Sequence, residues 1–172
     1  RGRALEMQYR FEEAEADYCQ ALQNYKYSYA HLYRGFLGLR KHSRLTLLGT
    51  PEAKAAAAAE RAREDLRLHT YYSTGDVQDD RNKFVAQTGV AYFSRDFDKV
   101  PMMAETAAGF DPSEWLCPYV KGLALARLER WDAALAAFEE ASKIHPYVAE
   151  PHAWAGFVQW KRGRPVEAIE AL

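Results

Sequence analysis

One spacing, 34 residues, recurs in this sequence and constrains its fold more strongly than any other feature. Gly122 lies 34 residues before Gly156, and Ala134 lies 34 residues before Ala168. Small side chains at such positions let two helices approach closely, and the large side chain of Phe138 follows four residues after Ala134. A helix–turn–helix unit of this length buries its apolar face only by stacking on neighbouring units. The spacing therefore predicts a repeat array.

Turn and capping signals place two helices within one such unit. Asp111 precedes a first-turn acid and an apolar-periodic segment, which predicts a helix over 116–128. Asp132 is suited to cap a second helix over 133–143, and Pro146 ends the unit. The unit is therefore expected to be two helices joined by a short turn.

This pattern resembles the tetratricopeptide repeat family. The family's consensus has small residues at positions 8, 20 and 27, a large residue at 24 and proline at 32, within a 34-residue unit. One unit of this sequence matches all five positions, with Gly122, Ala134, Phe138, Ala141 and Pro146. The resemblance implies an all-α fold, a right-handed α-solenoid of stacked helix–turn–helix repeats.

The same register divides the chain into five parts of a single array. We expect a partial repeat at 1–26, an enlarged irregular repeat at 27–77, full repeats at 78–112 and 113–148, and a partial repeat at 149–172. An array that begins and ends inside a repeat is expected to be a segment of a longer one.

The enlarged repeat departs from the family's length. It is predicted to contain a helix over 27–41, a loop over 42–50, an alanine-rich helix over 51–68 and a loop over 70–79. Alanine favours helix formation, and its small side chain permits close packing. The inserted region over 42–79 is either a structural spacer or a protrusion that contacts another domain.

Composition excludes several classes of function. The 23 basic and 24 acidic residues give a net charge of −1, whereas phosphate neutralisation supplies most of the affinity of nucleic-acid-binding proteins. No apolar run approaches the roughly 18–20 residues of a membrane-spanning helix. The two cysteines, Cys19 and Cys117, cannot form a disulfide framework, which favours a reducing compartment and a cytoplasmic location.

The sequence contains no recognisable catalytic or metal-binding motif. None of its five histidines belongs to an H-E-x-x-H motif, and no glycine-rich phosphate-binding loop is found. His145 and His152 flank one turn, but two histidines alone make a weak metal site. Cys19 is expected in the core, and Cys117 is expected to be partly exposed without an activating partner. We therefore expect no catalytic residue, cofactor or metal, and a protein that is not an enzyme.

The resemblance also implies a binding surface. In the family, side chains at fixed positions of the first helix in each repeat line a concave groove. Transferring those positions to this sequence predicts a mostly apolar and aromatic lining with a basic edge, which suits a peptide or an amphipathic helix of a partner. These residues are Asn82, Val85, Tyr92, Phe93, Leu116, Tyr119, Leu123, Arg127, Phe157, Trp160 and Lys161, with Tyr29, Leu32, Phe36 and Arg40 in the irregular repeat. Alternatively, some of the aromatic residues pack into neighbouring repeats or against the insertion.

One specialised groove of the family is not found. Members that bind acidic chaperone tails have Lys and Asn at two groove positions, where this sequence has Val85 and Gly89, then Tyr119 and Leu123. The carboxylate clamp for chaperone tails is therefore not expected.

The sequence thus predicts a protein–protein interaction scaffold that binds a peptide or helix of a partner in its concave groove. The partner is another protein or another domain of the same polypeptide. Two alternatives stay open. The chain is a regulatory or scaffolding region of a larger protein with a catalytic domain outside this segment, or it self-assembles by repeat stacking.

Overall fold

The computed structural model describes residues 1–24, 29–50, 52–72 and 77–171. Ten helices and no strand are formed within these residues. They are α1 (Gly2–Met7), α2 (Phe11–Asn24), α3 (Tyr29–Leu47), α4 (Glu52–Tyr72), α5 (Val77–Phe93), α6 (Val100–Phe110), α7 (Leu116–Arg127), α8 (Trp131–Ile144), α9 (Ala149–Lys161) and α10 (Pro165–Glu170).

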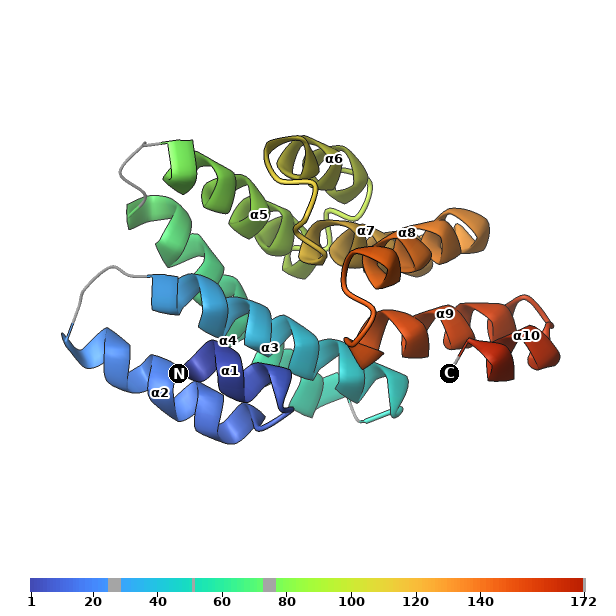
Figure 1. The fold of residues 1–172 in the computed structure, drawn as a ribbon, viewed down its shortest axis with the longest axis horizontal. Coiled ribbons are helices and arrows are strands. Elements are labelled where there is room, and N and C mark those ends of the chain that lie inside the picture. The colour runs from blue at the N-terminus through green and yellow to red at the C-terminus, as the bar shows by residue number, and fades with distance from the viewer. Residues whose placement is uncertain (25–28, 51, 73–76, 172) are drawn as a thin grey trace.

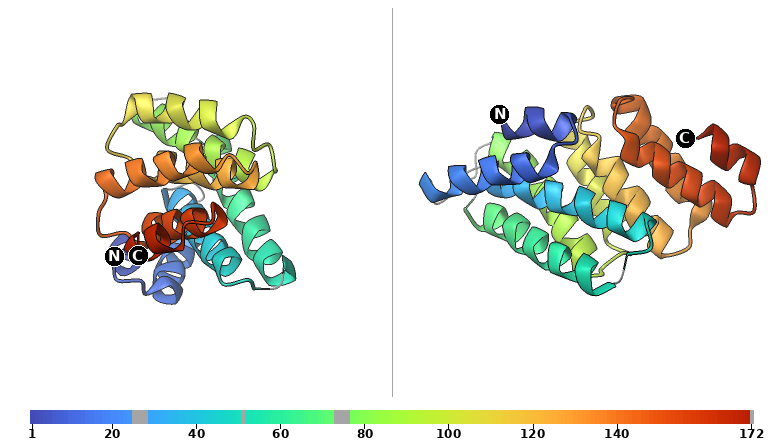
Figure 2. Two further views of the ribbon diagram at one scale, coloured as in Figure 1. Left: turned by 90° about the vertical axis from the view of Figure 1, so that its right-hand side faces the viewer. Right: turned by 90° about the horizontal axis from the view of Figure 1, so that it is seen from below.

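Each helix packs against the next one along the chain, from α1 through to α10. The successive helix hairpins stack one after another along the chain, as Figure 1 and the two views of Figure 2 show. The predicted fold class, an all-α solenoid of stacked helix–turn–helix units, is confirmed. No helix formed by the described residues is both long and apolar enough to cross a bilayer.

The small-to-large contact inferred from the repeat is present in two distant hairpins. A Cβ atom added at Gly122 would lie 2.6 Å from a ring carbon of Phe138, and one added at Gly2 would lie 2.5 Å from a ring carbon of Tyr18. In both hairpins the aromatic residue follows the glycine by 16 positions. The first helix therefore has to present a bare backbone to the ring on the second.

Two helices of the enlarged repeat extend further than predicted. The expected loop over 42–50 is wrong in extent, because α3 continues to Leu47 and ends only at Gly49, whose φ of 64° is in the left-handed region. The amides of Gly49 and Thr50 donate to the carbonyls of Thr46 and Leu45, which closes the helix. The α4 helix continues to Tyr72, and 73–76, within the second predicted loop, lie outside the described residues.

The predicted cap of α8 is also wrong. The helix begins one residue earlier than Asp132, and its N-cap residue, Arg130, makes no side-chain capping bond. Asp132 lies in the first turn instead, where it forms an ion pair with Arg162 from the end of α9. The carboxylate therefore links two hairpins instead of capping one.

Close approach of α3 and α4 explains the alanine-rich sequence of the insertion. A Cβ atom at Gly38 would lie 2.7 Å from the Cβ atom of Ala62, and one at Gly35 would lie 2.6 Å from Cγ of Leu66. Ala62 and Leu66 are both buried. Glycine on α3 and alanine on α4 thus bring the two helix backbones together along the hairpin.

The α3 helix also packs across the inner side of the array, against α5 and α9. The hydroxyl oxygens of Ser43 on α3 and Tyr119 on α7 are 2.6 Å apart in a buried hydrogen bond. Arg40 on α3 forms a buried ion pair with Glu150 on α9, at 2.9 Å. Figure 1 shows the C-terminal end of α3 beside the start of α9. The first helices of the hairpins therefore close on one another and leave little of the concave side open.

Replacing Gly38 with Ala should lower the free energy of unfolding by about 1–3 kcal/mol. The new methyl group meets a Cβ atom fixed to the backbone of α4, so the two helices must separate. The matched control is Gly109→Ala in α6, where an added Cβ has no heavy atom within 4 Å. This control should be neutral or stabilising by up to about 1 kcal/mol. Urea denaturation of both variants checks the prediction, and equal stabilities would refute the close α3–α4 packing.

Candidate functional site

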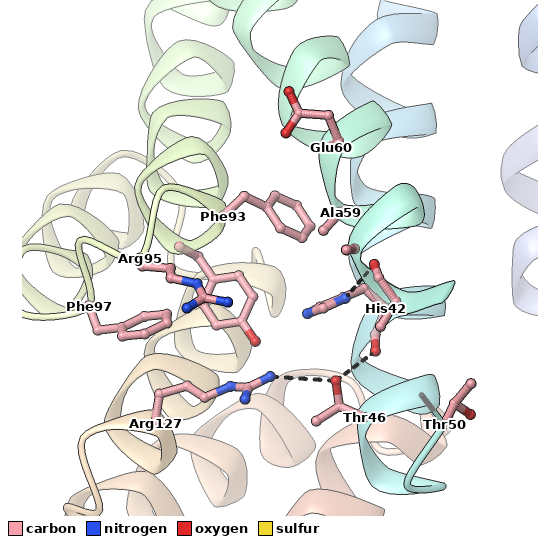
Figure 3. Close-up of a pocket in the computed structure, with 12 residues that line it drawn as sticks. His42, Thr46, Thr50, Ala59, Glu60, Phe93, Arg95, Phe97 and Arg127 are labelled. Atoms are coloured by element: carbon pink, nitrogen blue, oxygen red, sulfur yellow. Dashed lines mark hydrogen bonds between the residues drawn. The ribbon is translucent and has the colours of Figure 1, made fainter. Parts of the chain in front are cut away.

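An open pocket of about 610 Å³ lies where the C-terminal ends of three inner helices, α3, α5 and α7, meet the N-terminal half of α4. Its wall is formed by residues from four helices and two connecting segments, and Figure 3 shows them converging on one space. The lining residues are His42, Thr46, Thr50, Ala55, Ala56, Ala59, Glu60, Tyr92, Phe93, Arg95, Phe97 and Arg127.

Aromatic rings from the end of α5 and the following turn make one wall of the pocket. Tyr92 is buried, whereas Phe93 and Phe97 are half-buried and keep part of their rings accessible. The ring centroids of Tyr92 and Phe97 are 5.6 Å apart, and those of Tyr92 and Phe93 are 5.5 Å apart. The alanines of α4, including Ala59, form the opposite wall. The pocket therefore offers an apolar surface between two helices.

His42 projects from α3 into this space with a defined tautomer. Its Nδ1 atom lies 3.1 Å from the carbonyl oxygen of Ala55 and donates to it. The second ring nitrogen, Nε2, faces the pocket in Figure 3 and is left as an acceptor. Burial lowers the pKa of His42, the charge of Arg127 lowers it further, and the bond to Ala55 opposes both. The imidazole is therefore neutral at pH 7.

Arg127 closes the pocket at the end of α7. One of its guanidinium nitrogens donates to Oγ1 of Thr46 at 3.5 Å. Thr46 in turn donates to the carbonyl oxygen of His42 at 3.0 Å. Burial raises the pKa of Tyr92, so this hydroxyl stays neutral. The exposed guanidinium is thus held at the edge of the pocket by the neutral oxygen of Thr46.

The structure brings together only some of the predicted groove residues. Tyr92, Phe93 and Arg127 meet at the pocket, Leu116 and Phe157 are half-buried elsewhere, and Trp160 and Lys161 are exposed near the end of α9. Five of the eleven are buried, so the expectation that they line an open groove is wrong for Asn82, Val85, Tyr92, Tyr119 and Leu123. For Tyr119 the reason is α3, whose Ser43 bonds its hydroxyl. Partner binding by any of the eleven stays a prediction.

The family pattern did not indicate the pocket residues that come from the insertion. His42, Thr46 and Ala59 belong to the inserted region over 42–79, to which no consensus position was assigned. The only signal was the run of alanines, which predicts a closely packed helix without saying what its other face lines. The insertion is therefore part of the pocket wall and is more than a spacer.

Cysteines and histidines outside the pocket form no metal-binding group in the described residues. No group of three or more metal-ligating side chains occurs there, and Nε2 of His152 lies 3.2 Å from the carbonyl oxygen of Pro146. Cys117 is buried, contrary to the expected partial exposure, and burial raises the pKa of its thiol to about 12. Cys19, expected in the core, is half-buried and accepts a bond from Arg34 at 3.2 Å.

Fold and pocket together define a helical repeat protein with an aromatic and basic cavity at the ends of its inner helices. The chain is similar to the crystal structure of MamA, with a TM-score of 0.52 and 15% identity over 99% of this chain and 89% of that chain. Two further MamA structures, labelled MSR-1 and AMB-1, give TM-scores of 0.48 and 0.47 at 16% and 18% identity. These alignments cover 99% of this chain and 87% and 89% of the others. No family model matches the sequence, and no curated protein matches it. At this identity the likeness to MamA concerns the fold.

The environment of His42 predicts a pH dependence of stability. Because folding lowers the pKa below the ordinary value of 6.5, the neutral form is favoured in the folded state. Its contribution is present above pH 6.5 and is lost as the pH falls through the folded pKa. The groups that face the ring are the carbonyl of Ala55, the guanidinium of Arg127 and the rings of Tyr92 and Phe93. None of them is a carboxylate that would stabilise the imidazolium.

Between pH 7 and pH 5, the melting temperature of the wild-type chain should fall further than that of a His42→Gln variant, by on the order of 1–3 °C. Nitrogen NMR should show the Nδ1–H tautomer at pH 7 and a titration midpoint below 6.5 for His42. A midpoint at or above 6.5 would contradict the buried, hydrogen-bonded environment.

Proposed function

We propose that this chain is a protein-interaction module that binds a short segment of a partner protein in the pocket between α3, α4, α5 and α7. The observation that carries the proposal is the combination of accessible aromatic surface and an accessible arginine within one concave site. The partner segment belongs to another protein or to another domain of the same polypeptide.

The size and lining of the pocket suit such a segment. A volume of about 610 Å³ lies within the range of pockets that enclose a small ligand or a few side chains. Aromatic residues and arginine are enriched among the residues that supply most of the binding energy at protein interfaces. Phe93 and Arg127 are residues of these two types, and both keep accessible surface.

The polar groups of the pocket favour binding over catalysis. His42 is held by the carbonyl of Ala55, and Thr46 is held between the carbonyl of His42 and the side chain of Arg127. The hydroxyl of Thr46 donates its proton to a carbonyl oxygen and not to a base that would activate it as a nucleophile. The arrangement of these polar groups produces a rigid, preorganised surface, which lowers the entropy cost of binding.

The exposed residues of α9 are proposed as a separate contact region. The Nζ atom of Lys161 lies 5.5 Å from the ring centroid of Phe157 and 5.0 Å from that of Trp160. Trp160 is 60% exposed. This aromatic and basic cluster lies outside the residues that line the cavity. A partner segment would therefore contact it only if the segment extends beyond the pocket.

Short random peptides displayed on phage, selected on the folded chain, test the proposal. Selected peptides should bind Phe93→Ala and Arg127→Ala variants at least about tenfold more weakly than the wild-type chain, which corresponds to about 1.4 kcal/mol. The matched control is Met102→Ala, an exposed apolar residue of α6 outside the pocket, which should leave binding unchanged. Fluorescence anisotropy gives the dissociation constants. The pocket would be ruled out as the site if the folded Phe93→Ala and Arg127→Ala variants bound the peptides as tightly as the wild-type chain and the Met102→Ala control do. It would also be ruled out if no peptide were selected.

A further inference from the structure

We propose that the pocket recognises a peptide segment in which an Asp or Glu side chain lies next to an apolar residue, with the carboxylate bound by Arg127. This inference rests on the proposed function, since it names the chemistry of the segment that the same pocket would bind. The argument depends on charge, orientation and the distribution of apolar surface within the cavity.

The charge of Arg127 is not neutralised by a carboxylate among the described residues. Its guanidinium donates to the hydroxyl of Thr46, which is neutral. An arginine in a partly enclosed site pairs most favourably with an anion, and a carboxylate matches its planar fork. The position that the guanidinium leaves open is therefore complementary to an acidic group.

The acidic residue in the pocket wall does not provide that anion. The carboxylate of Glu60 accepts a hydrogen bond from Arg63 at 2.5 Å on the outer side of α4. In Figure 3 Glu60 lies at the opposite end of the cavity from Arg127. Arg95 lies on the same side of the cavity as Arg127 in this view. The two ends of the pocket therefore differ in charge, and the basic end faces an incoming carboxylate.

The orientation of Arg127 is set before a ligand arrives. Thr46 donates its proton to the carbonyl of His42, so its oxygen presents a lone pair to the guanidinium. A guanidinium has five donor N–H groups, and the bond to Thr46 leaves others for a second acceptor. Neutral His42, with Nε2 facing the cavity, can accept an N–H of the peptide backbone without competing for the carboxylate.

Apolar surface lies beside the basic end. Phe93 and Ala59 face each other across the cavity in Figure 3, with His42 on the side towards Arg127. Successive side chains of an extended peptide point to opposite sides, and alternate ones lie on the same side. A segment that places its carboxylate at Arg127 therefore brings a neighbouring side chain to Phe93.

The test compares matched synthetic peptides taken from the display selection. Selected sequences should be enriched in Asp or Glu adjacent to, or one residue away from, an apolar residue. Changing that acid to its amide, Glu to Gln or Asp to Asn, should weaken binding about five- to tenfold at low salt. The difference between the two peptides should shrink as sodium chloride is raised, because the screening length falls.

A double-mutant cycle assigns the effect to Arg127. In an Arg127→Gln variant, the acid and amide peptides should bind with the same affinity. The charge-matched control, Arg164→Gln, removes an arginine outside the pocket and should keep the full difference between the peptides. Thermal unfolding of both variants verifies that they are folded.

The outcomes separate this inference from the proposed function. Peptides that need Phe93 and Arg127 but bind equally as acid and amide would overturn the inference and leave the proposed function standing. Free acetate or inorganic phosphate that displaces the acidic peptide at the peptide's own concentration would show a simple anion site and would also overturn it. If no peptide is selected, the proposed function fails first, and the inference fails with it.

Discussion

A buried guanidinium, that of Arg40, is the constraint on which the arrangement of the inner helices depends. It is 2% exposed and bonds Glu150 of α9 at 2.9 Å and Glu6 of α1 at 3.3 Å. The ring centroids of Phe11 and Trp115 lie 5.0 and 5.7 Å from its central carbon. A buried charge without a partner costs several kcal/mol, so α1 and α9 must supply their carboxylates for α3 to lie where it does. Helices from opposite ends of the chain are thereby fixed to one another.

The position of α3 determines where a binding site can form. Because α3 contacts both α5 and α9, and its Ser43 bonds Tyr119, the concave side of the array is filled by the chain itself. Only the C-terminal ends of α3, α5 and α7 remain apart, and the pocket lies there. Glu6 shows the cost of this closure, since burial raises the pKa of its carboxyl despite bonds from Tyr18 and Arg40. The site is thus displaced from the groove to its end.

Local features of the fold could be predicted from the sequence. The glycine-to-aromatic contact at Gly122 and Phe138 depends on positions within one hairpin, and periodicity indicates it directly. The helix predicted over 27–41 ends too early. In the structure α3 continues to Leu47, because the segment after Lys41 carries no helix-breaking residue before Gly49 and packs on α4. Side chains that meet within a hairpin leave a pattern in the sequence, and helix ends set by tertiary packing do not.

The site was harder to predict because it depends on long-range contacts. Arg40 and Glu150 are 110 residues apart, and the family register predicted Arg40 as a lining residue of the groove. Nothing in the local sequence indicates that Arg40 is buried or that Tyr119 lies beneath α3. Phe93 and Arg127 were identified by the register, whereas His42 and Thr46 came from the insertion, where no register applies. Consensus positions therefore identified three of the twelve residues that line the pocket, and the others come from the insertion and from the segment after α5.

The measurement that tests this account most directly is a double-mutant cycle on Arg40 and Glu150, read by urea denaturation. Arg40→Met should lower the free energy of unfolding by about 3–5 kcal/mol, because it leaves the buried carboxylate of Glu150 without its partner. Glu150→Met should lower it by less, because Arg40 keeps its ion pair with Glu6. The double variant should be more stable than the sum of the two effects predicts, by at least about 1 kcal/mol, since the two residues are in direct contact. Additive effects, agreeing within about 0.5 kcal/mol, would show that α3 and α9 are not joined through this pair and would contradict the closed arrangement of the inner helices.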